Sequence, residues 1–286
     1  MLKYRLIFGT LMTLAFVGLM LADGWMDGSL SQSLHYRPIQ GTILCILVAL
    51  LAIPAVRELA TLAKAKGFRV FVPIAAAASI LIATSPYVRQ FVIIPADLYL
   101  AFLFVFTLFA VLIYQAKWYG TSGVIGNCGV SFLAIIYLGL LSSFVMAIRI
   151  DFGVWGLSAF VFVIKSSDIG AYTFGKLFGK HKFSPKISPG KTWEGMLGAV
   201  VFAAIVAFLF SMGCGIMPWQ QAVLFGVCFA FIGQLGDLAE SLIKRDAERK
   251  DSAQSVPGFG GVLDVIDSPL AAAPLVYLYF TLVGAQ

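Results

Sequence analysis

The sequence predicts an all-α, polytopic integral membrane protein, and three observations carry that prediction. Hydrophobic residues make up 60% of the chain, and its mean hydropathy is +0.94. Charged residues make up only 12%. Most of those charges lie between apolar stretches whose lengths suit a membrane crossing. An ordinary soluble domain of 286 residues does not have this composition, so that class is excluded.

Nine apolar stretches are candidate transmembrane helices. They are residues 4–22, 42–63, 70–84, 91–114, 122–148, 152–166, 195–212, 219–240 and 262–283. A spanning helix needs about 20 apolar residues, so 70–84 and 152–166 are the short ones. We interpret 4–22 as a span rather than a signal peptide, because its apolar run is long and no clean small-x-small cleavage site follows.

The distribution of Lys and Arg predicts the orientation. With the N-terminus in the cytoplasm, 17 of the 20 basic residues fall on the cytoplasmic side, and only Arg37, Arg89 and Arg149 fall outside. The positive-inside rule then predicts a cytoplasmic N-terminus and an outside C-terminus. Basic loops at a membrane surface also account for the pI of about 9.1 without a nucleic-acid partner. We expect two regions: 1–151 with about five helices, and a catalytic membrane region, 152–286, with two cytoplasmic polar loops.

The first polar region runs from 165 to 195. It holds six lysines in 27 residues, alternating with Gly, Ser and Pro, which let backbone N–H groups approach phosphates. Gly190-Lys191-Thr192 is not a P-loop, because the glycine required five residues earlier is Pro185. Two interpretations stay open for these lysines: phosphate binding, or membrane topology alone. Asp168 is equally open, as a functional acid or as an interfacial cap.

The second polar region, 233–268, has the spacing of a helix. Asp237, Ser241 and Lys244 follow i, i+4, i+7, and Glu240 lies at i+3 from Asp237, so they form one polar stripe. Carboxylates at the ends of membrane spans are difficult to accommodate and are functional candidates for that reason.

Two further acids open the last span. Asp264 and Asp267 are three residues apart and face one way, and Pro269 is expected to kink the helix beside them. Together with Asp237 they provide the hard oxygen ligands that Mg²⁺ takes beside substrate phosphates. The alternative for Asp264 and Asp267 is N-capping of the last helix.

At these residues the chain resembles the CTP:phosphatidate cytidylyltransferases, also called CDP-diacylglycerol synthases. The resemblance covers about 165–268, whereas the N-terminal half matches only as a set of hydrophobic spans. The matched residues are Ser167, Asp168, Gly170, Ala171, Tyr172, Gly179, Lys180, Ser188, Pro189, Lys191, Thr192, Trp193, Glu194, Gly195, Gly233, Gln234, Gly236, Asp237, Glu240, Ser241, Lys244, Arg245, Lys250, Asp251, Ala253, Pro257, Gly258, Gly260, Gly261, Asp264 and Asp267.

The resemblance implies a phosphatidate cytidylyltransferase that makes CDP-diacylglycerol and pyrophosphate from CTP and phosphatidic acid. It implies one or two Mg²⁺ ions, with Asp237, Asp264 and Asp267 as ligands, in a multi-pass protein of the inner or plasma membrane whose site faces the cytoplasm. A homodimer is left open. The implied catalytic residues are Lys191, Lys244, Arg245, Lys250 and Asp251. The implied substrate-binding residues are Asp168, Tyr172, Ser188, Thr192, Glu194, Gln234, Ser241, Gly260 and Gly261.

The sequence departs from the family pattern at four positions. Phe259 replaces a usual His, Val265 a usual Arg, Gly190 a usual Lys and Lys176 a usual Arg. Three other functions therefore stay open: a CTP-dependent lipid or polyprenol kinase, a secondary transporter that uses the acids as an ion path, and an inactive lipid-binding scaffold.

Overall fold

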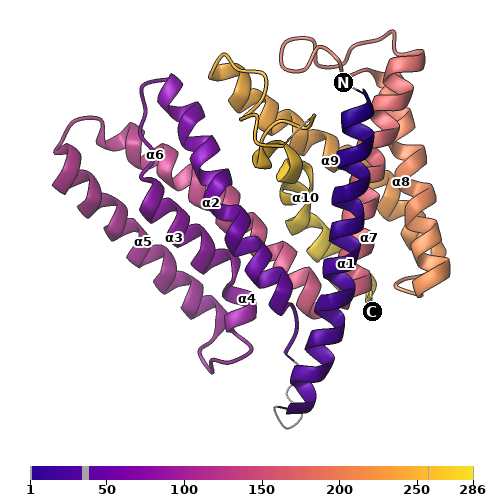
Figure 1. Cartoon of the computed structure of the whole chain (residues 1–286), viewed down its shortest axis with the longest axis horizontal. Coiled ribbons are helices and arrows are strands. Elements are labelled where there is room, and N and C mark those ends of the chain that lie inside the picture. Colours follow the sequence, from indigo (N-terminus) through magenta and orange to yellow (C-terminus); the bar gives the residue numbers. More distant parts are fainter. Residues whose placement is uncertain (1, 34–38, 257, 286) are drawn as a thin grey trace. The chain divides into compact units, whose positions relative to one another are not determined.

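The computed structural model describes residues 2–33, 39–256 and 258–285, so Arg37 and Pro257 lie outside the described residues. Within these ranges every regular element is a helix (Figure 1), which confirms the predicted class. The helices are α1 Leu2–Ser33, α2 Thr42–Ala65, α3 Val72–Ala83, α4 Ser85–Val88, α5 Ala96–Tyr119, α6 Val124–Ile135, the π-helix η1 Ile136–Leu140, α7 Leu141–Phe178, α8 Trp193–Cys214, α9 Trp219–Asp246 and α10 Val262–Val283.

Seven helical segments are long and apolar enough to cross a membrane, which indicates a multi-pass membrane protein. One of them, Val124–Phe178, has 55 residues and is broken at Gly153, where φ is 69° and ψ is −171°. A straight helix of that length would measure roughly 80 Å, far more than a bilayer, so we interpret the two sides of Gly153 as separate passes. α3 is a shorter apolar helix. The count of nine and the orientation stay predictions.

Several helix boundaries differ from the sequence-based ones. α5 begins at Ala96 rather than at 91, because the chain reaches it through Pro95, which occupies the N-cap position. α7 continues to Phe178 and α9 to Asp246. Both helices extend beyond their apolar stretches into the polar regions, since polar residues sustain backbone hydrogen bonds as well as apolar ones do. The helical stripe expected on 237–244 is confirmed. α10 continues as one helix past Pro269 and Pro274.

The chain divides into two compact units, 1–150 with 246–265 and 151–245 with 266–286. In the first unit α3 contacts α2, α5, α6 and η1 (Figure 1). Its interior is built from fully buried aliphatic residues, among them Val56, Ile82 and Ile135. The segment 246–265 carries much of the polar region yet belongs to this first unit by its packing.

In the second unit small residues let helices approach closely. A Cβ added to Gly198 on α8 would overlap Gly170 O on α7, and the reverse also holds. A Cβ added to Gly236 on α9 would lie 2.6 Å from the Cβ of Ala271 on α10. Small residues at helix contacts are typical of membrane proteins, where packing drives association. The contact at Gly236 brings the polar stripe of α9 against the start of α10.

Candidate active site

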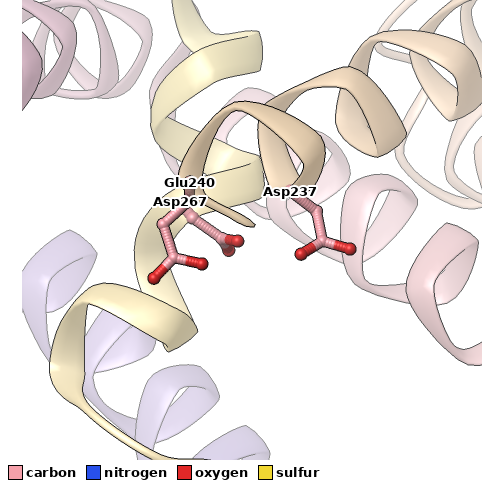
Figure 2. Close-up of side chains that lie close together, drawn as sticks. All are labelled: Asp237, Glu240 and Asp267. Atoms are coloured by element: carbon pink, nitrogen blue, oxygen red, sulfur yellow. The ribbon is translucent and has the colours of Figure 1, made fainter. Parts of the chain in front are cut away.

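Three carboxylates converge where α9 approaches α10. Asp237 and Glu240 project from α9 and Asp267 projects from α10 (Figure 2). One oxygen from each lies within 4.8 Å of the others. Glu240 and Asp267 are buried, whereas Asp237 is about one third exposed, at 37% of its side chain. We call these residues the acidic cluster. Like charges at such spacing repel strongly in a poorly solvated site, so the arrangement calls for cations.

Two lysines supply positive charge to the acidic cluster. Lys191 precedes α8, and its Nζ lies 2.7 Å from Asp237 Oδ2 while it donates a hydrogen bond to Gln234 O at 2.8 Å. Lys244, one turn along α9 from Glu240, is buried and forms an ion pair with it. Both lysines were candidates from the sequence. The structure brings them to the same acidic cluster, where each pairs with a different carboxylate.

Asp168 extends this polar network onto α7. Its Oδ1 accepts a hydrogen bond from Gln234 Nε2 at 3.3 Å, and its Oδ2 accepts one from Lys165 Nζ at 3.3 Å. With Asp168 and Lys165 included, the network contains four carboxylates and three lysines, a formal net charge of −1. Asp168 therefore lies within α7 as part of this polar network rather than at a helix end, and its role toward substrate stays a prediction.

The loop between α7 and α8 is held by its own polar residues. Thr192 caps α8, because its Oγ1 accepts from Gly195 N at 3.1 Å. Glu194 accepts from Lys180 N at 3.0 Å and from the backbone of His181, and it lies 2.6 Å from the ring nitrogen Nδ1 of His181. Arg245 Nε on α9 donates to Ile187 O at 3.1 Å. These contacts fix the path of the chain into Lys191.

Three further residues predicted to bind substrate, Ser188, Tyr172 and Ser241, also lie in the second unit. Ser188 O accepts from Lys191 N at 3.1 Å, which closes a turn just before the lysine. Tyr172 on α7 is half exposed, and Lys176 Nζ lies 5.8 Å from the centre of its ring. Ser241 is partly buried on α9. For all of these residues, and for Thr192 and Glu194, a role in binding substrate stays a prediction.

In the first unit, the segment 247–261, here called the signature loop, turns back into α10. Gly260 has a φ of +103°, a conformation that residues with a side chain rarely adopt, and an added Cβ would lie 2.6 Å from Asp264 Oδ2. Asp264 Oδ2 accepts from Gly261 N at 2.7 Å, from Ser252 N at 3.0 Å and from Ser252 Oγ at 2.7 Å. The expected alternative for Asp264, capping of the last helix, is therefore present.

A buried acid from the N-terminal half completes this arrangement. Glu58 on α2 is only 6% exposed. Its carboxylate accepts from Val262 N at 3.0 Å and Leu263 N at 2.9 Å, the first amides of α10. It also accepts from Ser255 Oγ at 2.9 Å, and Ser252 Oγ lies 2.9 Å from it. We call Glu58 with Asp264 the carboxylate pair of the loop.

The cations of the signature loop face solvent. Arg249, Lys250 and Asp251, with Ala253 and Gln254, line an open hollow of about 420 Å³. Lys250 and Asp251 are exposed, so Lys250 is accessible to a phosphate, and the catalytic role of Asp251 stays a prediction. Phe259, which replaces the usual His, is about one third exposed, and its ring lies 3.3 Å from where a Cβ on Gly9 of α1 would be.

The sequence predicted Asp237, Asp264 and Asp267 as metal ligands, and that prediction lacked two acids. Glu240 was noted on the stripe but not chosen as a ligand, although its i+3 position from Asp237 puts both on one face. Glu58 was not considered at all. Its signal was available, since it is a lone acid within the apolar stretch 42–63.

The acidic cluster fits a divalent metal ion by its chemistry. Three carboxylate oxygens from two helices, each within 4.8 Å of the others, can share one cation as hard ligands. Asp267 is also oriented, because its Oδ1 accepts from Ser268 N at 2.6 Å. A Mg²⁺ held by few carboxylates keeps positions for substrate phosphates.

A family model described as "Cytidylyltransferase family" matches residues 33–283. Similar curated proteins are each called "Phosphatidate cytidylyltransferase". The protein from Haemophilus influenzae is 44% identical over 131 residues, 43% of this chain and 46% of the relative. The protein from Bacillus subtilis is 40% identical over 154 residues, 52% of this chain and 57% of the relative. The protein from Chlamydia muridarum is 35% identical over 191 residues, 62% and 61%. The chain spans about half the length of the curated relatives it matches.

Proposed function

This chain belongs to the Cytidylyltransferase family, and we propose that it is a phosphatidate cytidylyltransferase that uses CTP. The observation that carries the proposal is the acidic cluster with Lys191 beside it. Catalysis of phosphoryl-type transfer consists mainly of positioning the reactants and neutralising their charge. Carboxylates that can hold a metal ion, next to lysines that can neutralise phosphate, suit that chemistry.

In the proposed reaction a phosphate oxygen of phosphatidate attacks the α-phosphorus of CTP. A new P–O–P bond forms, and the bond from the α-phosphorus to the oxygen that bridges to the β-phosphate breaks. Pyrophosphate leaves with that electron pair, and the lipid product is CDP-diacylglycerol. The nucleophile is already an anion, so the reaction needs no strong general base. The residues must instead place two polyanions against each other.

Asp237, Glu240 and Asp267 would hold the Mg²⁺, with Asp264 as a further ligand predicted from the sequence. When bound, the metal neutralises charge on the phosphate oxygens. Lys244 offsets the charge of Glu240 from inside the helix pair. Lys191 pairs with Asp237, the most exposed acid of the cluster, where its ammonium group could exchange that carboxylate for a phosphate oxygen.

Lys250 and Asp251 are exposed on the signature loop of the first unit, and their catalytic roles stay as the sequence predicts them. Arg249 and Lys250 line the open hollow of that loop, where their positive charges suit a phosphate group. Arg245 contributes by anchoring the Lys191 loop through Ile187 O. Gln234 and Asp168 tie α9 to α7 and so fix the carbonyl that Lys191 contacts.

We place the reaction at the cytoplasmic surface of the cell membrane. One substrate is a lipid and the other is water-soluble, so the site must lie at the membrane boundary. The basic loops predict that this boundary is cytoplasmic and that the C-terminus lies outside. A C-terminal reporter that is active only in the cytoplasm should therefore be silent. Activity in that reporter would mean an even number of spans. The homodimer stays a prediction.

A labelled nucleotide tests the activity directly. Purified protein, phosphatidate, Mg²⁺ and CTP labelled in the α-phosphate should yield labelled lipid and one pyrophosphate per lipid. A parallel assay uses CTP labelled in the γ-phosphate. Label in the lipid from that assay, with none from the α-labelled CTP, would overturn the proposal in favour of a lipid kinase. The Asp237→Asn variant, mixed with the same substrates, serves as the control for contaminating activity.

A further inference from the structure

We propose that Glu58 is a positioning residue of the transferase site, acting as the missing N-cap side chain of α10. The proposal rests on the proposed function, and it assigns a task to the N-terminal half that no motif there indicates. Its basis is a set of contacts within the first unit, from Glu58 on α2 to the signature loop and to the first turn of α10.

The first turn of a helix exposes backbone N–H groups that have no partner within the helix. An N-cap side chain normally accepts hydrogen bonds from them. In α10 the N-cap position is Gly261, which has no side chain. Glu58 supplies the acceptor from a different helix, with Oε1 on Val262 N and Oε2 on Leu263 N. A carboxylate at this position also interacts favourably with the helix dipole.

The glycine at the N-cap is what admits Glu58. A Cβ on Gly261 would overlap both Glu58 Oε2 and Ser252 Oγ. Asp264, at the third helical position, reaches back to Gly261 N at 2.7 Å, which is one half of a capping box. Glu58 supplies an acceptor in place of the other half. The Gly260-Gly261 pair therefore has a packing reason in addition to any contact with substrate.

The same carboxylate fastens the signature loop onto α2. Ser255 Oγ donates to Oε1, and Ser252 Oγ lies between Glu58 Oε2 at 2.9 Å and Asp264 Oδ2 at 2.7 Å. The serine has one proton, so it serves one carboxylate at a time. Loss of Glu58 would leave two buried amides and two hydroxyls without this acceptor. The loop that presents Lys250 would then lose its attachment to α2.

The experiment compares Glu58→Gln with Arg57→Ala, a change at the exposed neighbouring position. Glutamine keeps the shape of the Glu58 side chain but replaces one acceptor oxygen with an NH₂ group, which cannot accept a hydrogen bond from a backbone N–H. We expect Glu58→Gln to reduce kcat/KM at least about tenfold, mainly through a higher KM for CTP, since loosened cations bind phosphate less well. Amide hydrogen exchange in 251–263 should rise in the same variant. Arg57→Ala should change neither measurement.

Two further variants separate positioning from general stability. Leu59→Ala removes a buried apolar side chain next to Glu58 and lowers stability while it leaves the Glu58 carboxylate in place, so below its unfolding temperature KM should stay normal. Gly261→Ala should reproduce the Glu58→Gln effect, whereas Gly129→Ala, which has open space around it, should not.

The proposal is overturned if Glu58→Gln loosens 251–263 but leaves kcat and KM unchanged, or if Leu59→Ala raises KM equally. Unchanged hydrogen exchange in Glu58→Gln would also overturn it. A wild-type protein without cytidylyl transfer would instead count against the proposed function, while the exchange measurement would still report whether Glu58 holds the signature loop and the start of α10.

Discussion

The acidic cluster and the carboxylate pair of the loop are built from the same kind of residue but have different partners. Glu58 and Asp264 accept hydrogen bonds from backbone amides and serine hydroxyls. Asp237, Glu240 and Asp267 face one another; Asp237 and Glu240 pair with lysine ammonium groups, and Asp267 accepts from its own neighbour Ser268 rather than from a distant segment. Amide donors fix a carboxylate in the fold, whereas facing carboxylates leave a site for a cation. The difference teaches that the partners of a buried acid, rather than its motif, indicate whether it supports structure or binds a ligand.

The largest effect is expected at the acidic cluster. Asp237→Asn or Asp267→Asn should lower turnover by about a thousandfold or more, because the charge stabilisation that a metal provides is worth several kcal/mol. Product formation across a Mg²⁺ titration measures it, with size-exclusion chromatography to verify folding. Asp97→Asn, an exposed acid in the first turn of α5, is the matched control. Near-normal turnover in the Asp267 variant would remove that residue from the metal site.

The next effect is expected in the turn that presents Asp264. Gly260→Val should lower turnover about a hundredfold, because a β-branched residue is strained at a φ of +103° and its Cβ crowds Asp264 Oδ2. Phe259→His at the neighbouring position should change the rate by less than about threefold, since pyrophosphate bound to metal is a good leaving group. Initial rates of CDP-lipid formation test both. If wild type is inactive and Phe259→His restores turnover, the scaffold alternative gains.

Removal of the Lys191 side chain, which pairs with the partly exposed Asp237, should have a smaller effect. Lys191→Ala is expected to raise the KM for CTP or lower kcat by about tenfold, a loss of about 1.4 kcal/mol of transition-state stabilisation. Lys182→Ala, an exposed lysine of the same loop, should change either constant less than about twofold. Equal, small effects at the two positions would show that the loop's charge serves topology alone.

Asp264→Asn sharpens the comparison most directly, although its effect is the smallest of the carboxylate changes. If Asp264 mainly holds the loop, the variant should lose activity about tenfold, because it weakens the hydrogen bonds from Gly261 and Ser252 that cap α10. Its half-saturating Mg²⁺ concentration should then stay at the wild-type value. An increased Mg²⁺ requirement, like that expected for Asp237→Asn, would place Asp264 in the metal site as the sequence predicted.

Much of this protein follows from short-range patterns in the sequence. Apolar runs with few charges fixed the helical membrane class, since a bilayer requires internally satisfied backbone groups. The i, i+4, i+7 spacing from Asp237 to Lys244 placed those residues on one helical face. Motif similarity led to the candidate residues on α9 and α10. These features depend on neighbours within a few positions, so the order of residues alone determines them.

The tertiary structure decided which acids meet. Glu240 joins Asp267 only because Gly236 lets α9 approach Ala271 on α10. Glu58 reaches Val262 and Leu263 across about 200 positions of sequence. No local pattern encodes such a contact, because it depends on how α2 packs beside the signature loop. The sequence determined the helices and their polar faces, whereas side-chain packing between distant segments determined which carboxylates hold the fold and which remain for a cation.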